Sequence, residues 1–202
     1  LNTCHIREKA VEKTYSELGR IRDQANLRKE KTGKKTIIAV AGCVAQAEGD
    51  QIMKRSPWVD IVVGPQSYQN LPELISKVDP IEKNKLISID YPVIPKFDQL
   101  KSKITQRGPS AFLTIQEGCD KFCSFCVVPY TRGSEYSRSI NSIIDEAKKL
   151  IDAGVKEITL LGQNVNAWSS KGKDGKVWRL VSLIKELAKI NELQFIRYTT
   201  SH

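Results

Sequence analysis

Short apolar runs of strand length alternate with longer amphipathic segments along most of this 202-residue chain. The run Thr36–Ala41 is continuous, apolar and rich in β-branched residues, which is typical of a buried parallel strand. Gly42 and Cys43 follow it and lead into a helical segment. The pattern predicts a small α/β layer domain with a parallel sheet. Its predicted elements are a helix over 5–31 that ends at Gly33, strands over 36–41, 59–63 and 85–89, and helices over 45–55 and 70–78.

A second series of strands and helices begins at Ala111. Its order of strand, loop and helix suits the first part of a (β/α) barrel, whose chemistry sits at the carboxyl ends of the strands. Pro92, Pro95 and Pro109 lie between the two series and indicate a linker. The predicted N-terminal domain, linker and second domain span residues 1–90, 91–109 and 110–202. The second domain is predicted to contain strands over 112–116, 157–161 and 194–199, helices over 140–152 and 178–190, and a polar loop over 163–176.

The composition is that of a globular protein with a basic surface. Hydrophobic residues make up 40% of the chain, charged residues 27%, and the net charge is +9. No apolar run approaches the length of a membrane span, and no signal peptide opens the sequence, so the expected location is the cytoplasm. The positive charge permits binding to a polyanion such as RNA, although a solvated lysine-rich surface explains the same net charge.

The five cysteines point to metal or redox chemistry, because an odd number in a reducing compartment argues against a disulfide framework. Cys119, Cys123 and Cys126 form the pattern C-x3-C-x2-C within eight residues. Thiolates are the usual ligands of iron–sulfur clusters, and three of them leave one iron of a four-iron cluster open to a small molecule. We therefore expect this loop to hold a catalytic cluster.

Two other interpretations of the cysteine loop remain open at this point. A structural zinc site needs four Cys or His ligands, and the only histidines, His5 and His202, are remote in the sequence. Three buried structural cysteines are the other alternative, which the polar loop and the tight spacing disfavour.

The loop QEGCDKFCSFCVVPYTRG, which follows the first strand of the second series, resembles the radical S-adenosylmethionine superfamily. The resemblance implies that S-adenosylmethionine chelates the open iron of a [4Fe–4S] cluster and is cleaved to give a 5′-deoxyadenosyl radical. It also implies that Phe125 lies against the adenine, although a core aromatic is an equal alternative. Gly162 and Gln163 end the second strand of this series, where related enzymes bind the amino group of the cofactor. A simple turn is the other interpretation of the glycine.

The segments NTCHIRE and AGCVAQAEGDQI narrow the resemblance to the methylthiotransferases. In that family three cysteines of the N-terminal domain hold a second, auxiliary [4Fe–4S] cluster. Cys4 and Cys43 correspond to two of them, and the third would precede Leu1. Both thiols are predicted to lie at helix starts, where the helix dipole stabilises a thiolate. Without the resemblance, two buried structural cysteines would explain them equally well.

Loop sequences further along resemble the branch that acts on N6-isopentenyladenosine beside the tRNA anticodon. These sequences are CVVPYTRGSEYSR, LLGQNVNAW and RYTTSH. The resemblance implies transfer of a methylthio group to C2 of that adenine. Family members commonly have proline at the position of Ser139, a small departure. Arg132 and Arg138 suit a cofactor carboxylate or a tRNA phosphate, and a surface role is equally compatible.

The resemblance also implies tRNA as substrate, an electron donor such as flavodoxin or ferredoxin, no membrane and a monomer. The rival enzymes are sibling methylthiotransferases acting on threonylcarbamoyl-adenosine in tRNA or on an aspartate of a ribosomal protein. A rival of another class is a zinc-stabilised RNA-binding module. Because the chain lacks an initiator methionine and ends after a strand-like run, we expect a fragment that is inactive alone.

Overall fold

The computed structural model describes residues 1–5, 7–79, 84–91, 108–172 and 175–199. The chain forms two compact units, Leu1–Leu100 with Tyr130–Arg132, and Lys101–Pro129 with Gly133–His202. Most of the predicted linker, residues 92–107, lies outside the described residues, as do Ile6 and His202. The predicted domain boundaries therefore stay predictions. No helix among the described residues is long and apolar enough to cross a bilayer.

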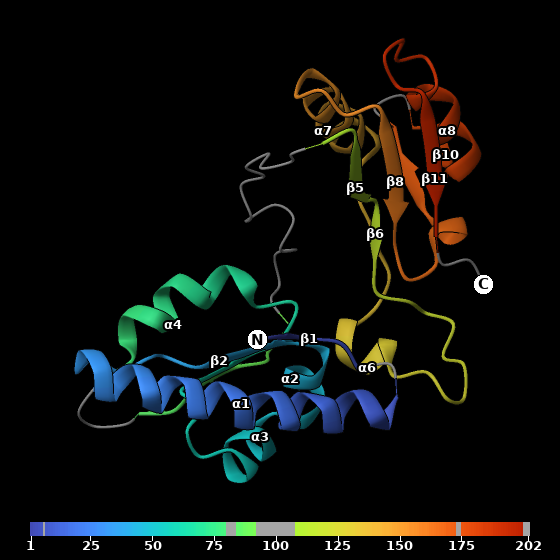
Figure 1. Ribbon diagram of the computed structural model, residues 1–202. Helices are drawn as coiled ribbons and strands as arrows, with labels where there is room; N and C mark the ends of the chain where they lie inside the picture. The colour runs from blue at the N-terminus through green and yellow to red at the C-terminus, as the bar shows by residue number, and fades with distance from the viewer. Residues whose placement is uncertain (6, 80–83, 92–107, 173–174, 200–202) are drawn as a thin grey trace. The chain divides into compact units, whose positions relative to one another are not determined.

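A four-stranded parallel sheet forms the centre of the first unit, as the sequence predicts (Figure 1). Its strands follow chain order across the sheet. They are β1 (Asn2–Thr3), β2 (Ala39–Gly42), β3 (Ile61–Val63) and β4 (Leu86–Ser88). The helices of this unit are α1 (Glu8–Thr32), α2 (Cys43–Glu48), α3 (Asp50–Arg55), the 3-10 turn η1 (Tyr68–Asn70) and α4 (Leu71–Lys77). The two-residue strand β1 is too short to carry a hydrophobic pattern, and the sequence does not reveal it.

One core joins α1, α2 and α3 to the sheet. Val11 and Leu18 of α1 are buried against Val40 of β2 and Val62 of β3, together with Ile52 of α3. The predicted single helix over 45–55 is wrong, because two helices meet at Gly49, which adopts φ 51° and ψ −121°. Residues other than glycine seldom adopt that backbone conformation, so the helix axis changes direction at Gly49.

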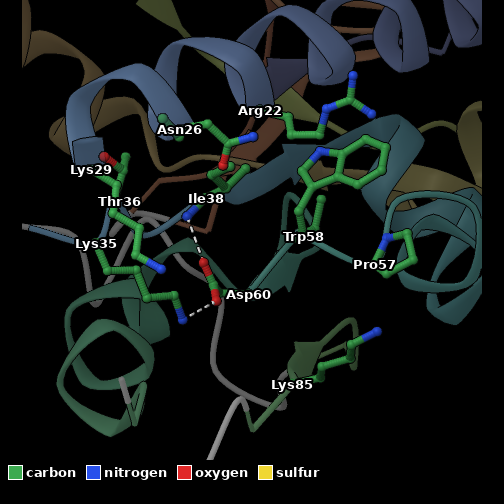
Figure 2. A pocket seen from close by; sticks show the side chains of 12 residues that line it. Arg22, Asn26, Lys29, Lys35, Thr36, Ile38, Pro57, Trp58, Asp60 and Lys85 are labelled. Carbon is green, nitrogen blue, oxygen red and sulfur yellow. Dashed lines mark hydrogen bonds and ion pairs between the residues drawn. The ribbon is translucent and has the colours of Figure 1, made fainter. Parts of the chain in front are cut away.

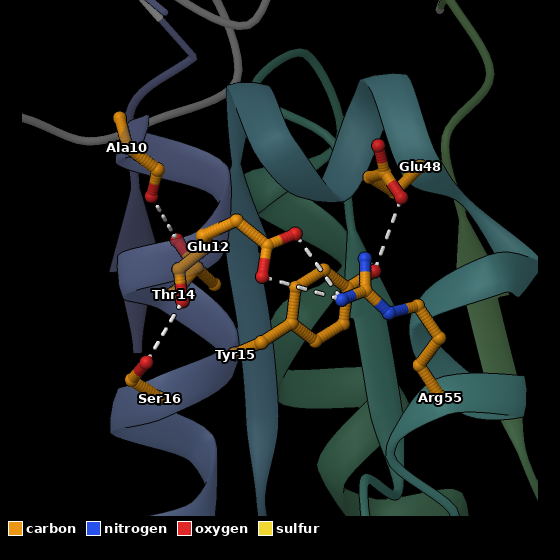
Figure 3. Close-up of polar contacts among 7 residues, drawn as sticks. All are labelled: Ala10, Glu12, Thr14, Tyr15, Ser16, Glu48 and Arg55. Carbon is orange, nitrogen blue, oxygen red and sulfur yellow. Dashed lines mark hydrogen bonds and ion pairs between the residues drawn. The ribbon is translucent and has the colours of Figure 1, made fainter. Parts of the chain in front are cut away.

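A polar cluster fixes α1 against the pair α2–α3 (Figure 3). The hydroxyl of Tyr15 donates a hydrogen bond to Glu48 Oε2 at 3.1 Å. The guanidinium of Arg55 lies 3.6 Å from the centre of the Tyr15 ring, and its Nη2 contacts Glu12 Oε1 at 3.2 Å. Burial, and then the hydrogen bond to Glu48, raise the pKa of Tyr15 to about 12. The neutral phenol is therefore the form that this contact favours.

The second unit is built on a parallel sheet of three strands in the order β11–β8–β5 (Figure 1). The strands are β5 (Ser110–Thr114), β8 (Glu157–Leu161) and β11 (Phe195–Tyr198). The helices α7 (Ile140–Asp152) and α8 (Leu180–Leu187) share one core with them, formed around Leu113, Ile158 and Leu160. The fold class predicted from the sequence is thus confirmed as mixed α/β with parallel sheets. The parallel strands occupy the start of a barrel-like series.

Three predicted elements of this unit are wrong in detail. Gln116–Glu117 (β6) leaves the first strand and pairs antiparallel with Tyr136–Ser137 (β7). The predicted polar loop contains the 3-10 turn η2 (Val165–Ala167) and the strand β9 (Ser169–Lys171). Helix α8 starts two residues late because Val177–Arg179 (β10) pairs with β9, and Trp178 packs against the core. An isolated hairpin has no strong sequence pattern, and tertiary packing decides its formation.

Ser139 is the N-cap of α7, which gives this departure from the family pattern a structural role. Its Oγ accepts a hydrogen bond from the backbone N–H of Ser142 at 3.2 Å. We expect Ser139→Ala to lower the free energy of unfolding by about 1 kcal/mol, because one amide at the helix start loses its partner. Urea denaturation measures the change, and Ser124→Ala, an exposed serine outside the helices, is the control. Equal stability of the two variants would contradict this role.

Candidate functional site

The cysteine loop is closed at its base by the antiparallel pair of β6 and β7. Gln116 pairs with Ser137 and Glu117 with Tyr136, so the chain leaves and returns at one place. A short helix, α6 (Val128–Arg132), follows the last cysteine, and its final three residues belong to the first unit. The loop therefore starts at the carboxyl end of the first barrel-like strand, where the sequence places the chemistry.

The three cysteines of the loop have partly restricted access to solvent. Cys119 is buried, whereas Cys123 and Cys126 are half-buried, and all five cysteines of the chain are thiols rather than disulfides. The amide of Cys119 donates to Gly133 O at 3.2 Å, and that of Cys126 donates to Cys123 O at 2.9 Å. Within the described ranges, no three His, Cys, Asp or Glu side chains are close enough together to hold a metal ion. The donor set, three thiols on one loop, nevertheless fits a cluster bound by three cysteines.

A pair of glutamines ties this loop to the loop after β8, and we call Gln116, Gly118 and Gln163 the glutamine bridge. Oε1 of Gln116 accepts hydrogen bonds from the amides of Gln163 at 2.8 Å and Asn164 at 3.1 Å. Its Nε2 donates to Gly118 O at 2.6 Å. In return, the amide of Gly118 donates to Gln163 Oε1 at 2.8 Å. Since Gln116 has no exposed surface, the bridge is a buried polar network that fixes the start of the cysteine loop.

Gly162 is required by the close approach of Gln116. A Cβ on Gly162 would lie 2.5 Å from Gln116 Oε1, which is shorter than any real contact of that kind. The described contacts of Gly162 and Gln163 are thus with the glutamine bridge, and their role toward the cofactor stays a prediction. Asn164 is also buried, and neither polar atom of its side chain has a hydrogen-bond partner among the described residues.

Gln116 is a functional candidate that sequence reasoning missed, and the burial of Asn164 could not be predicted either. The only available signal for Gln116 is a polar residue that ends an otherwise apolar strand, and such a residue is common at strand ends. Asn164 stands in a polar loop whose composition gives no sign of burial.

Arg138 has a structural role in the second unit. Its Nη1 donates to Thr114 O, and its Nη2 contacts Glu146 Oε2, each at 2.5 Å. The side chain is only 11% exposed. Burial and these contacts between β5 and α7 contradict a plain surface role, which is one of the alternatives for this residue. A role toward the cofactor or a tRNA phosphate stays a prediction.

Aromatic side chains on the cysteine loop face solvent. Phe125 is 92% exposed, which contradicts the alternative that it is a core aromatic. Phe122 is also exposed and adopts a positive φ of 48°, an unusual conformation for a residue with a bulky side chain. Where the chain returns from the loop, burial raises the pKa of Glu135, and the hydroxyl of Ser137 opposes that shift by its hydrogen bond. An exposed ring beside the cysteines is available to a ligand.

In the first unit, sheet register brings Cys4 and Cys43 to the same edge. Thr3 of β1 is paired with Gly42 of β2, and each cysteine is the next residue along its chain segment. Cys43 is buried at the first position of α2, as predicted, whereas Cys4 is exposed. The predicted place of Cys4 at a helix start is wrong, because α1 begins only at Glu8. A Cβ on Gly42 would lie 2.2 Å from Thr3 O, so glycine permits this close pairing. The two thiols therefore share the carboxyl edge of the sheet.

Comparison with known proteins gives matches in both halves of the chain. Residues 1–64 match the uncharacterized protein family UPF0004, and residues 113–202 match the radical SAM superfamily. The chain is 60% identical over its 202 residues to a protein of Rickettsia bellii named tRNA-2-methylthio-N(6)-dimethylallyladenosine synthase. Proteins of the same name from Rickettsia rickettsii and Agrobacterium fabrum are 59% and 57% identical. The whole chain is covered in each comparison, and it spans 45% of the length of each relative.

The first match lies within the first unit and contains Cys4 and Cys43, and the second contains the three cysteines of the loop. The superfamily matched by residues 113–202 implies the use of S-adenosylmethionine and an iron–sulfur cluster. The identity of 60% is taken over the whole chain, which includes both matches. The chain thus matches the radical SAM superfamily over residues 113–202 and is similar along its whole length to proteins named tRNA-2-methylthio-N(6)-dimethylallyladenosine synthase.

Proposed function

We propose that this chain is part of an enzyme that transfers a methylthio group to C2 of N6-isopentenyladenosine beside the tRNA anticodon. The observation that carries the proposal is the identity of 57–60% over the whole chain to synthases named for this product. A cytoplasmic location, tRNA as substrate, an electron donor such as flavodoxin or ferredoxin and a monomeric state belong to the same proposal.

Cys119, Cys123 and Cys126 would hold one [4Fe–4S] cluster, and Cys4 and Cys43 would contribute to a second. With S-adenosylmethionine bound, the first cluster would supply the radical chemistry that an unactivated aromatic C–H bond requires. The protein contributes binding and orientation. The glutamine bridge fixes the backbone at Gly118, directly before the first cysteine, and the exposed Phe125 offers an apolar face to the cofactor's adenine.

Analysis of tRNA nucleosides tests the proposal. The full-length protein containing this chain is expressed in a bacterial host that lacks its own enzyme of this kind, and digested tRNA is analysed by mass spectrometry. We expect 2-methylthio-N6-isopentenyladenosine with the intact protein and none with Cys123→Ala, because a cluster needs all three thiolates. Ser124→Ala changes an exposed neighbour on the same loop and is expected to keep the activity.

Iron and zinc content, measured on the same samples, separates the rivals. Iron-loaded protein that leaves isopentenyladenosine unmodified and instead methylthiolates threonylcarbamoyl-adenosine would refute the substrate assignment and identify the sibling enzyme. Iron-loaded protein that modifies the ribosomal protein would also refute the substrate assignment and would identify the other sibling enzyme. A colourless protein that contains zinc would refute the radical mechanism.

A further inference from the structure

A cavity of about 290 Å³ lies in the first unit at the amino-terminal edge of its parallel sheet (Figure 2). Residues before β2, β3 and β4 line it on one side, and the second half of α1 lines it on the other. Cys4 and Cys43 follow the carboxyl ends of β1 and β2, so they lie at the opposite edge of the sheet. The cavity, which we call the α1–Trp58 cavity, is therefore separate from the cysteines of this unit.

Cationic side chains surround the α1–Trp58 cavity. Arg22, Lys29, Lys35 and Lys85 line it, with Lys85 Nζ donating to Met53 O at 3.2 Å, and Asp60 is the one acidic residue among the lining residues. Both oxygens of Asp60 are already used, because Lys35 Nζ contacts Oδ1 at 2.8 Å and the amide of Ile38 donates to Oδ2 at 2.9 Å. The cations outnumber the acids even when Asp23, which pairs with Arg22 from outside the lining, is counted. A site with this surplus attracts an anion.

Trp58 gives the cavity a fixed aromatic wall. Its Nε1 donates to Leu18 O at 3.2 Å, which fixes the ring against α1. The guanidinium of Arg22 lies 4.8 Å from the centre of the same ring. Stacking on an aromatic ring limits the freedom of an arginine, and such a preorganised guanidinium suits phosphate. Nε and Nη2 of Arg22 contact Asp23 Oδ1, each at 2.9 Å, so a phosphate would share this arginine with that carboxylate.

A buried hydroxyl supplies independent evidence for a ligand. Thr36 is one of the lining residues, and its Oγ1 is shielded from solvent and has no hydrogen-bond partner among the residues that the structure describes. A buried hydroxyl without a partner costs free energy, so such groups are normally satisfied by protein, water or ligand. An oxygen of a bound anion would accept this hydrogen bond.

We propose that the α1–Trp58 cavity binds a phosphate group of the RNA backbone, away from the base that is modified. This inference rests on the proposed function, because it takes tRNA as the ligand. Backbone phosphates are the groups that position a protein on RNA without reading its sequence. The site adds affinity and orientation, and it leaves the chemistry at the cysteines unchanged.

Three variants of the full-length protein test the proposal by tRNA binding at several salt concentrations. Lys29→Gln removes one cation of the cavity, and Thr36→Val removes the hydroxyl while nearly keeping its volume. Lys31→Gln is the matched control, since Lys31 is an exposed lysine in the same last turn of α1 that does not line the cavity. We expect Lys29→Gln to weaken binding about threefold or more and to reduce the slope of log affinity against log salt by about 1.

The outcomes distinguish this inference from the proposed function. A loss with Lys29→Gln and Thr36→Val, but not with Lys31→Gln, supports the site even if no methylthio product is formed. Equal effects of Lys29→Gln and Lys31→Gln would overturn it. Inorganic phosphate serves as a competitor, and if it binds the intact protein in a manner that Thr36→Val abolishes while tRNA binding is unchanged, the ligand is a free anion and the RNA assignment is wrong. Circular dichroism verifies that each variant is folded.

Discussion

Gly118→Ala is expected to remove most of the cluster iron from the full-length protein. Gly118 directly precedes Cys119 and adopts a φ of 76°. A Cβ there would lie 2.0 Å from Ser134 O and 2.6 Å from Gly133 O. Both atoms belong to the backbone and cannot rotate away, so the start of the cysteine loop must move. Left-handed backbone strain of about 1–2 kcal/mol adds to an overpacking cost of about 1–3 kcal/mol.

Gly154→Ala is the matched control for this prediction. Gly154 also has a positive φ, 95°, but a Cβ there meets no atom within 4 Å. The control is therefore expected to lose only about 1–2 kcal/mol in the free energy of unfolding, from backbone strain, and to keep its iron. Iron analysis and visible absorbance measure the cluster, and urea denaturation measures stability. If Gly118→Ala keeps as much iron as Gly154→Ala, then contact with the carbonyl groups of the returning chain does not position the cysteines.

The sequence predicts the long, regular elements well because their packing is visible in the pattern of residues. Helix α7 spans Ile140–Asp152 and strand β8 spans Glu157–Leu161, as their periodicity predicts. Each buries an apolar face in the same core, so local pattern and tertiary structure agree. The break at Gly49 and the pair of β9 and β10 could not be predicted. A glycine is compatible with a helix interior, and a hairpin depends on contacts with the rest of the unit.

The chemistry of the site is easier to predict than its support. The spacing of Cys119, Cys123 and Cys126 indicates a set of metal ligands, since few other roles need three thiols so close together. Gln116 gives no such signal, because its importance lies in three side-chain hydrogen bonds to residues far along the chain or on the loop. Only the parallel pairing of β5 with β8 brings the two loops together at one edge.

Gln116→Met is expected to lower both the stability of the full-length protein and its iron content. Methionine nearly keeps the length and volume of glutamine but forms none of the hydrogen bonds of the glutamine bridge. The amides of Gln163 and Asn164 and the carbonyl of Gly118 would lose their partner in a buried place. Each unsatisfied buried group costs about 1–3 kcal/mol, so we expect a loss of about 3 kcal/mol or more in the free energy of unfolding.

Gln163→Met provides the comparison that isolates the buried network. It removes the single hydrogen bond from the amide of Gly118 to Gln163 Oε1, and Gln163 is only half-buried. We expect Gln163→Met to lower the free energy of unfolding by about 1 kcal/mol. Urea denaturation ranks the two variants by stability, and iron analysis ranks them by iron content. If the variants are equally stable and bind equal amounts of iron, the hydrogen bonds of Gln116 do not hold the cysteine loop. If Gln116→Met is the weaker in both measurements, the cluster depends on a polar side chain that does not itself bind iron.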